Sequence, residues 1–383
     1  MNDNNLQQIF SHYTEKFEYV NNPEHSECYK WQVAKEFRTL MDRALSEPVE
    51  SFAEALNAVN LATKNIINNF TQPFNGLVKM AQKEPETVQQ MFRNLYSDDE
   101  GSLEKQEQLI SDFFKKSYEL VDKYYPGSYR FKQNSHSVSA YLFLYDPDRH
   151  YLFKASHAKE FAECICFYDE WGTGDLIRLK PFYRMCDQLL EEIKKNKELL
   201  ATDASRYDGR FPVKPDQMHA DKEKHVLVFD IIYCCSTYDL FDGISFKRLS
   251  TKEKQLYNER QKKALELLQA YNDAVDRQDK LRDILEHGMV LLKKGTGIKH
   301  RKYGAGTVKE IDEEYITVQF DNEAEPAKLG LPIVLANKLI SSDKEGFDEY
   351  LNENVMLLKK EDSIKRGVEY ARNALKPYEM YLE

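Results

Sequence analysis

The chain has 383 residues, of which 42% are hydrophobic, 31% charged and 12% aromatic. This length predicts two or three domains, and the even spread of apolar residues argues against long disordered stretches. A net charge of −10 argues against indiscriminate coating of nucleic acid, which needs clustered cations, but it leaves room for a local basic patch. There is no apolar run of about 18 residues and no pattern of an export signal at the start. We therefore expect a cytoplasmic protein without a membrane span.

The cysteines and histidines give no metal pattern. No C-x-x-C pair occurs, and the spacing of His219 and His225 does not match a zinc site. We expect buried free thiols, no metal and no cofactor. The cysteines are Cys28, Cys164, Cys166, Cys186, Cys234 and Cys235.

Residues 1–125 carry apolar positions at helical spacing, interrupted by turn signals such as "NNPEH". Pro85 with acidic neighbours is typical of the first turn of a helix. Another helix is expected over residues 104–123. The sequence predicts a helical N-terminal region.

Residues 126–250 show a different pattern. "SVSAYLFLYDPDRHYLFK" is rich in β-branched and aromatic residues, and Asp146-Pro147-Asp148 lies between its two apolar runs, which predicts a β-hairpin over residues 139–154. Helices are expected over residues 158–166 and 181–200. The continuous apolar run "HVLVFDIIYCC" predicts one buried strand over residues 225–235. This middle region is therefore expected to be α+β.

The last third predicts three parts. Residues 251–287 form one long charged helix with a narrow apolar stripe, ended by Gly288. Residues 288–343 contain short alternating strands, and residues 344–383 form a closing helix. The predicted fold class is therefore multidomain α+β, with a helical region, an α+β middle, a linking helix, a small β-barrel and a C-terminal helix.

The glycines of "KKGTGIKHRKYGAGTVKEIDEEYITVQFD", residues 293–321, raise the question of a phosphate-binding loop. Such a loop needs G-x-x-x-x-G-K-[ST] between a buried strand and a helix. Here a strand pattern follows Gly304 and Gly306, so the glycines indicate turns and bulges of a small sheet.

This stretch resembles the tudor/SH3-like modules of bacterial repair helicases and transcription-coupling factors. The shared features are the basic-aromatic pair Lys302-Tyr303, the glycines that follow it, and a strand that ends in Phe320-Asp321. The resemblance implies a barrel without catalysis that docks on a protein, such as a polymerase or a restriction component, or on nucleic acid. The candidate docking residues are Lys299, Arg301, Lys302 and Tyr303. The alternative is that these are ordinary solvated hairpin faces.

Segments spread over residues 8–240 resemble, in the same order, the region ahead of the motor in McrB-like restriction ATPases/GTPases. They include "YTEKFEYVNNPEHSECYKWQVAKEF", "MAQKEPETVQQMFRNLYSDD", "SAYLFLYDPDRHYLFK" and "LKPFYRMCDQLLEEIKKNKEL". The resemblance implies recognition of a target, often DNA. This chain has no Walker A lysine and no Walker B strand after Cys235, so nucleotide-driven translocation is not carried over.

Basic residues mixed with aromatic residues provide candidate contacts to DNA or RNA. One group surrounds the expected hairpin and another lies on one helix; core packing and solvated faces are the alternatives. The candidates are Lys132, His136, Arg149, His150, Lys154, Tyr151, Lys30 and Lys35.

The strongest enzymatic alternative is a divergent Mg²⁺-dependent nuclease built on Asp216, Asp221, Glu223 and Asp230. The acid-x-lysine expected on its second strand is missing. We therefore expect a protein without catalytic activity that recognises nucleic acid, in defence against foreign DNA or in DNA transactions. A protein-protein adaptor that docks through the barrel is the second hypothesis, and the nuclease is the third.

Overall fold

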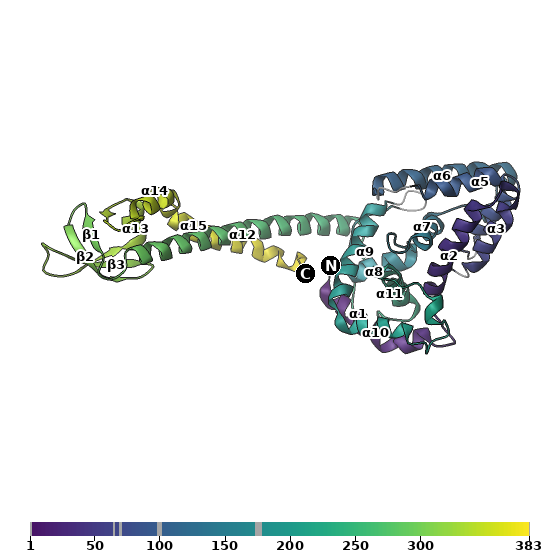
Figure 1. Ribbon diagram of the computed structural model, residues 1–383, viewed down its shortest axis with the longest axis horizontal. Helices are drawn as coiled ribbons and strands as arrows, with labels where there is room; N and C mark the ends of the chain where they lie inside the picture. The colour runs from purple at the N-terminus through teal and green to yellow at the C-terminus, as the bar shows by residue number, and fades with distance from the viewer. Residues whose placement is uncertain (1, 64–65, 69–70, 98–101, 173–177, 383) are drawn as a thin grey trace. The chain divides into compact units, whose positions relative to one another are not determined.

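The computed structural model describes residues 2–63, 66–68, 71–97, 102–172 and 178–382 (Figure 1). The chain divides into two compact units, Met1–Lys254 and Gln255–Glu383. Within the described ranges, no helix combines the length and the apolar character needed to cross a membrane. The predicted mixed α+β class is confirmed, but the strands described in the structure all lie in the second unit.

The first unit is built from helices, which Figure 1 shows in purple to teal. They pack around one apolar core that contains aromatic residues from most of the helices. The α-helices are α1 (Asp3–Asn21), α2 (Tyr29–Ser46), α3 (Val49–Ala62), α4 (Pro73–Ala81), α5 (Pro85–Leu95), α6 (Leu103–Tyr124), α7 (Ser135–Tyr145), α8 (Ala155–Cys164), α9 (Leu179–Lys195), α10 (Lys197–Ala204) and α11 (His225–Thr237). Short 3₁₀ helices are η1 (Ser205–Tyr207) and η2 (Pro215–Gln217).

Polar side chains determine where several of these helices begin. The side chains of Asn2 and Ser102 accept hydrogen bonds from the first turns of α1 and α6. Pro85 lies in the first turn of α5, as its position in the sequence predicts. The helix predicted over residues 104–123 is present as α6.

The hairpin predicted over residues 139–154 is wrong. Its first half belongs to α7, which begins with a capping box in which Asn134 and Ser137 each accept from the other's backbone N–H. Residues 137–144 are all buried, so α7 has no polar face that would reveal a helical period. Asp146 and Pro147 do form the expected turn, and residues 151–154 then run on without forming a strand.

The strand predicted over residues 225–235 is also wrong, because this run forms α11. The helix contacts α1, α2, α8 and α9, and ten of its residues are buried. A helix that is buried over most of its surface has the same continuous apolar sequence as a buried strand, so the two cannot be separated by periodicity alone.

The second unit contains most of α12 (Thr251–Leu291), the helix predicted over residues 251–287. Gly288 does not end this helix, contrary to expectation. A Cβ atom there would lie 2.5 Å from the Tyr350 hydroxyl, which donates a hydrogen bond to the Ile284 carbonyl. Glycine therefore allows α14 (Phe347–Leu358) to approach α12 closely.

A small antiparallel sheet follows α12, with strand order β4-β3-β2-β1-β5. Its inward side chains include Ile298, Val308, Ile316 and Val318, and they share a core with α12 and α14. We call residues 297–341 the sheet module. Its elements are β1 (Gly297–His300), β2 (Gly304–Ile311), β3 (Tyr315–Phe320), β4 (Ala327–Gly330), α13 (Leu331–Ala336) and β5 (Ile340–Ser341).

The single closing helix predicted for residues 344–383 is interrupted. The chain forms α14, then α15 (Glu361–Leu375) and the 3₁₀ helix η3 (Lys376–Tyr381). The interruption at Lys359 and Lys360 lets Leu358 and Ile364 join the same core.

The sheet module provides a test of this packing. A Cβ atom on Gly306 would lie 2.7 Å from both the Gln319 carbonyl oxygen and Phe320 Cδ1, whereas one on Gly297 would meet nothing within 4 Å. We expect Gly306→Ala to destabilise the module by about 1–3 kcal/mol, the usual cost of overpacking, and Gly297→Ala to be tolerated. Hydrogen exchange of the β2 and β3 amides measures the difference. Equal protection in the two variants would contradict this packing.

Candidate functional site

The interior of the first unit contains a network of charged side chains. Lys30 Nζ on α2 lies 2.5 Å from Asp230 Oδ1 on α11 and 2.9 Å from Glu27 Oε2. Arg206, from η1, lies 3.3 Å from Asp203 and 3.7 Å from Asp230. Lys30, Arg206, Asp203 and Asp230 are each at most 1% exposed.

Neutral groups add hydrogen bonds to this buried charge network. Tyr13 donates to Asp230 over 2.6 Å, and Arg206 donates to Asn21 and to the Tyr13 hydroxyl. The Arg206 guanidinium also lies 3.6 Å from the centre of the Trp31 ring. With Lys224 paired to Asp203, the three cations of the network face the three carboxylates of Glu27, Asp203 and Asp230. The network is therefore electrically balanced.

Lys30 is therefore part of the interior, so the predicted surface contact of its ammonium group with nucleic acid is wrong, and the alternative of a solvated face is wrong as well. Its ammonium group does reach one residue at the edge of the network. Lys30 Nζ lies 3.8 Å from the centre of the Tyr233 ring on α11, and Lys154 Nζ lies 4.3 Å from the same centre. The His157 ring on α8 stacks on Tyr233, with the centroids 5.0 Å apart and the planes 8° apart. We call Lys30, Lys154, His157 and Tyr233 the Tyr233 cluster.

Lys154 differs from Lys30 because it has no carboxylate partner among the residues that the structure describes. Half-burial and, after it, the charge of Lys30 lower the pKa of Lys154 to about 8. Burial, with Lys154 and Lys30, lowers the pKa of His157 to about 4, so this ring is neutral at pH 7. The cluster thus holds one cation, Lys154, that forms no ion pair in the described part of the chain, and the charge of Glu27 offsets it only in part.

Small polar groups border Lys154 and His157. Ser156 Oγ lies 3.1 Å from His157 Nδ1, and Thr237 Oγ1 lies 3.3 Å from His157 Nε2. Ser156 and Thr237 are exposed, whereas Lys154, His157 and Tyr233 are half-buried. Exposed hydroxyl groups therefore border the His157 ring, which stacks on the same tyrosine that Lys154 lies over.

The structure places His136 near this cluster but turned inward. Its two ring nitrogens lie 3.0 Å from the Phe153 carbonyl and 2.8 Å from the Ile66 carbonyl. Burial lowers the pKa of His136 although both carbonyls oppose the shift. His136 therefore anchors the segment before Lys154.

The other residues predicted to contact nucleic acid are dispersed. His150 and Tyr151 are buried, where they hydrogen bond to Tyr183 and Asp187, so the predicted surface role for these two is wrong. Arg149 is half-buried in the turn after α7. Two exposed lysines have other neighbours: Lys132 lies 5.7 Å from the Tyr118 ring, and Lys35 donates to the Asp216 carbonyl.

The four docking residues of the sheet module separate into two pairs. Tyr303 packs on His300 and Phe320, and Lys302 lies 5.0 Å from the Tyr303 ring. Lys299 and Arg301 instead line a groove of about 320 Å³ together with Lys338 and residues of α14.

The carboxylates proposed for a nuclease do not come together. Asp230 belongs to the buried charge network, and Glu223 lies 3.5 Å from Lys194. The two oxygens of Asp221 accept hydrogen bonds from the N–H groups of Val226 and Leu227, so Asp221 caps α11. Burial raises the pKa of Asp221 to about 7.

Asp148, His219 and Asp221 are close enough to share a metal ion. However, His219 Nδ1 accepts from the Asp221 N–H, which places the proton of the neutral ring on Nε2, toward Asp148. A metal would have to displace this proton and the cap of α11. The arrangement therefore suits a helix cap better than a metal site.

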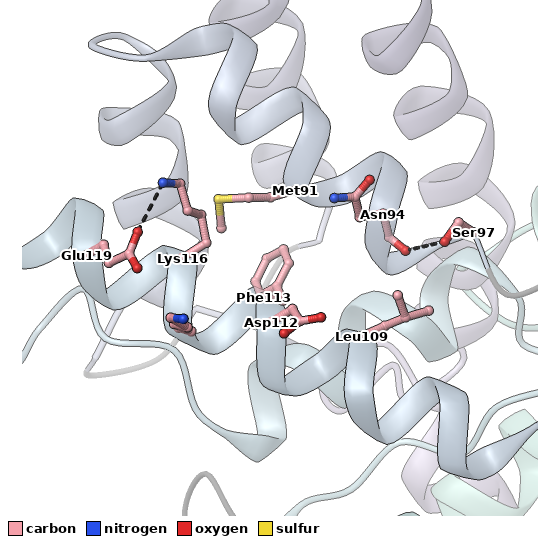
Figure 2. Close-up of a pocket in the computed structure, with 9 residues that line it drawn as sticks. Met91, Asn94, Ser97, Leu109, Asp112, Phe113, Lys116 and Glu119 are labelled. Carbon is pink, nitrogen blue, oxygen red and sulfur yellow. Dashed lines mark hydrogen bonds and ion pairs between the residues drawn. The ribbon is translucent and has the colours of Figure 1, made fainter.

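A larger hollow of about 590 Å³ lies between α5 and α6. Figure 2 shows Met91 and Phe113 at its floor. Lys116 pairs with Glu119 at 3.0 Å, and Ser97 donates to the Asn94 carbonyl. Because these polar groups already have partners, we assign no ligand to this hollow.

Tyr233 and His157 were not found from the sequence. Tyr233 lies in the run predicted as a strand. In a strand, residues 230 and 233 point to opposite faces, so the prediction did not place Tyr233 beside Asp230. In a helix, positions 230, 233 and 237 share one face. The aspartate at position 230 is the one charged residue within this apolar run, and it could have indicated that face.

Comparison with protein families, with curated proteins and with solved structures finds no match for this chain.

Asp230 provides the test of the buried charge network. Burial by itself raises the pKa of Asp230, but Lys30 and Arg206 outweigh it and hold the pKa below its usual range. Its stabilisation is therefore complete above the pKa of an unfolded aspartate, about 4, and is lost as the pH falls through the lower folded pKa.

We expect Asp230→Asn to lower the free energy of unfolding at pH 7 by about 3–5 kcal/mol, because two buried cations lose their shared anion. Exposed Asp122 on α6 is the control, and Asp122→Asn should change stability by less than about 0.5 kcal/mol. Urea unfolding at pH 7 and pH 3 measures both. A difference between wild type and Asp230→Asn that is as large at pH 3 as at pH 7 would argue against an ionised Asp230.

Proposed function

We propose that the protein is a non-catalytic recognition protein that binds the phosphate backbone of DNA or RNA at the Tyr233 cluster. The observation that carries this proposal is Lys154, a half-buried cation that lies over an aromatic ring and has no carboxylate partner in the part of the chain that the structure describes. A phosphate supplies the missing negative charge. Because burial has already removed part of the hydration of the Lys154 ammonium group, a phosphate that binds it loses less to desolvation.

The surroundings of Lys154 favour a phosphate over a lone inorganic cation or an apolar ligand. The hydroxyl groups of Ser156 and Thr237 are exposed and lie within hydrogen-bond distance of the His157 ring in the same cluster. Phosphate contacts of this type position a nucleic acid without reading its sequence. The proposal thus concerns binding to the backbone and assigns no base preference.

The resemblance of residues 8–240 to the target-binding region of McrB-like proteins supports the same function. It suggests a role in defence against foreign DNA or in DNA transactions in the cytoplasm. The order of the five strands supports the further proposal that the sheet module is a tudor/SH3-like barrel. No catalytic step is included, since the chain lacks the Walker A lysine of the motor proteins.

Binding of a labelled 20-nucleotide DNA or RNA, followed by fluorescence anisotropy across salt concentrations, tests the proposal. We expect Lys154→Ala to weaken binding to all sequences and to reduce the slope of log K against log[salt] by about one. Lys83→Ala removes an exposed lysine of the same unit and should leave the affinity unchanged. Equal affinities of Lys154→Ala and wild type would overturn the assignment.

The pKa of Lys154 adds a second test. Since this pKa is about 8, the wild-type side chain loses its charge between pH 7 and 9, and affinity should fall over that range. Lys154→Arg keeps its charge at every pH, because the pKa of arginine exceeds about 12, and should remove this part of the pH dependence. A pH profile that is identical in wild type and Lys154→Arg would mean that Lys154 does not contact the bound anion.

A further inference from the structure

The sheet module contains a second group of cations that form no ion pair within the described ranges. The groove of about 320 Å³ runs between β5, the end of β1 and α14. Lys299, Arg301 and Lys338 line it. Within the described chain, Lys299 and Arg301 have no hydrogen-bonded or ion-paired side-chain partner, and Lys338 donates only to the neutral amide of Asn352, over 2.5 Å.

The backbone holds these three cations in place. Lys299 is on the outward face of β1, where it pairs in register with Ser341 of β5. The Arg301 N–H donates to the Leu339 carbonyl over 2.9 Å, which joins the turn after β1 to the segment that carries Lys338. Lys338 has a positive φ of 49°, a conformation that non-glycine residues seldom adopt. The three positions are therefore fixed by the fold rather than by long mobile loops.

The groove has other features that a ligand must satisfy. Its floor contains Leu339, Ile340 and Leu351, of which Ile340 and Leu351 are each 3% exposed. Asp348 and Asn352 of α14 form the wall opposite the strands, and both are exposed. β5 is the last strand of the sheet in the described order, and it has only two residues. The groove thus combines cations, one carboxylate, an apolar floor and the end of a sheet.

We infer that this groove, formed by β1, β5 and α14, is a docking surface for an extended acidic peptide segment of a protein partner. Carboxylates of the peptide would pair with Lys299, Arg301 and Lys338. The apolar side chains of the peptide would contact the floor of the groove, and its backbone N–H groups would donate hydrogen bonds to the Asp348 carboxylate. This surface is separate from the Tyr233 cluster, which lies in the other unit.

An acidic peptide fits this groove better than a nucleic acid does. Asp348 would repel a phosphate backbone, whereas a peptide offers donors to it. The part of the sheet module that follows carries Glu310, Asp312, Glu313, Glu314, Asp321, Glu323 and Glu325 without a cation between them. A continuous polyanion laid across the module would meet these carboxylates, but a short peptide confined to the groove would not.

The test uses the full chain and a fluorescein-labelled hexapeptide that alternates glutamate and leucine. We expect Lys299→Glu combined with Arg301→Glu to weaken peptide binding at least tenfold. The control is Lys293→Glu combined with Lys294→Glu, which makes the same change in charge at two exposed residues outside the groove lining and should change affinity less than twofold. Lys154→Ala should leave peptide binding unchanged.

Two outcomes would overturn the inference. One is equal loss of peptide binding in the two charge-reversal pairs, which would indicate attraction by net charge alone. The other is an oligonucleotide of the same charge that binds more tightly than the peptide and loses its affinity in Lys299→Glu, Arg301→Glu, which would make the groove a phosphate site. Circular dichroism of both variants checks that the module remains folded.

Discussion

The carboxylate of Asp230 determines much of the first unit. It lies in α11, among apolar residues that leave it no contact with water, and an unpaired charge there would cost several kcal/mol. The chain meets this requirement from three directions, since Lys30 comes from α2, Tyr13 from α1 and Arg206 from η1. Four segments that are far apart in sequence are therefore held in one register. Each of these hydrogen bonds and ion pairs is buried and requires a defined geometry. They therefore restrict the relative positions of the four segments more than apolar packing alone does.

This network also explains why Lys30 and Lys154, which lie over the same aromatic ring, differ in chemical character. Lys30 has Asp230 and Glu27 within ion-pair distance, and these acids, Asp230 foremost, raise its pKa above the usual range against the effect of burial. Lys154 is partly desolvated and stands beside that positive charge without an acid of its own, so its pKa falls. The buried charge network thus contains equal numbers of cations and carboxylates, whereas Lys154, at the half-buried edge, has no ion pair among the described residues. The proposed anion site at Lys154 rests on this difference in pairing between the two lysines.

The sequence predicted some elements well because local chemistry specifies them. Pro85 marks the start of α5 by a group that lies within the same turn, and the alternation of residues 315–320 matches the burial pattern of β3. The errors fell on residues 139–144 and 225–235, all of which are buried except the half-buried Tyr233. A run without a polar face carries no period, and its β-branched and aromatic residues favoured the wrong element. A strand places its side chains alternately on two faces, so the wrong strand predictions for α7 and α11 also give wrong neighbours for Tyr141, Tyr151 and Tyr233.

The candidate sites show the same division. Lys154, Lys299 and Arg301 were identified because a lysine or arginine near aromatic residues is visible in sequence, but their state of pairing is not. Acidic residues outnumber basic ones in this chain, 64 to 54, so most cations can find a carboxylate nearby. Lys30, Arg206 and Lys224 form such ion pairs, whereas Lys154 and the cations of the sheet-module groove form none among the described residues. In an acidic protein, a cation that is fixed by its surroundings and left without a counter-charge indicates a position where an external anion lowers the free energy. Whether a cation lacks a counter-charge depends on which carboxylates the fold has already paired with other cations. Such positions can therefore be identified only from the three-dimensional structure.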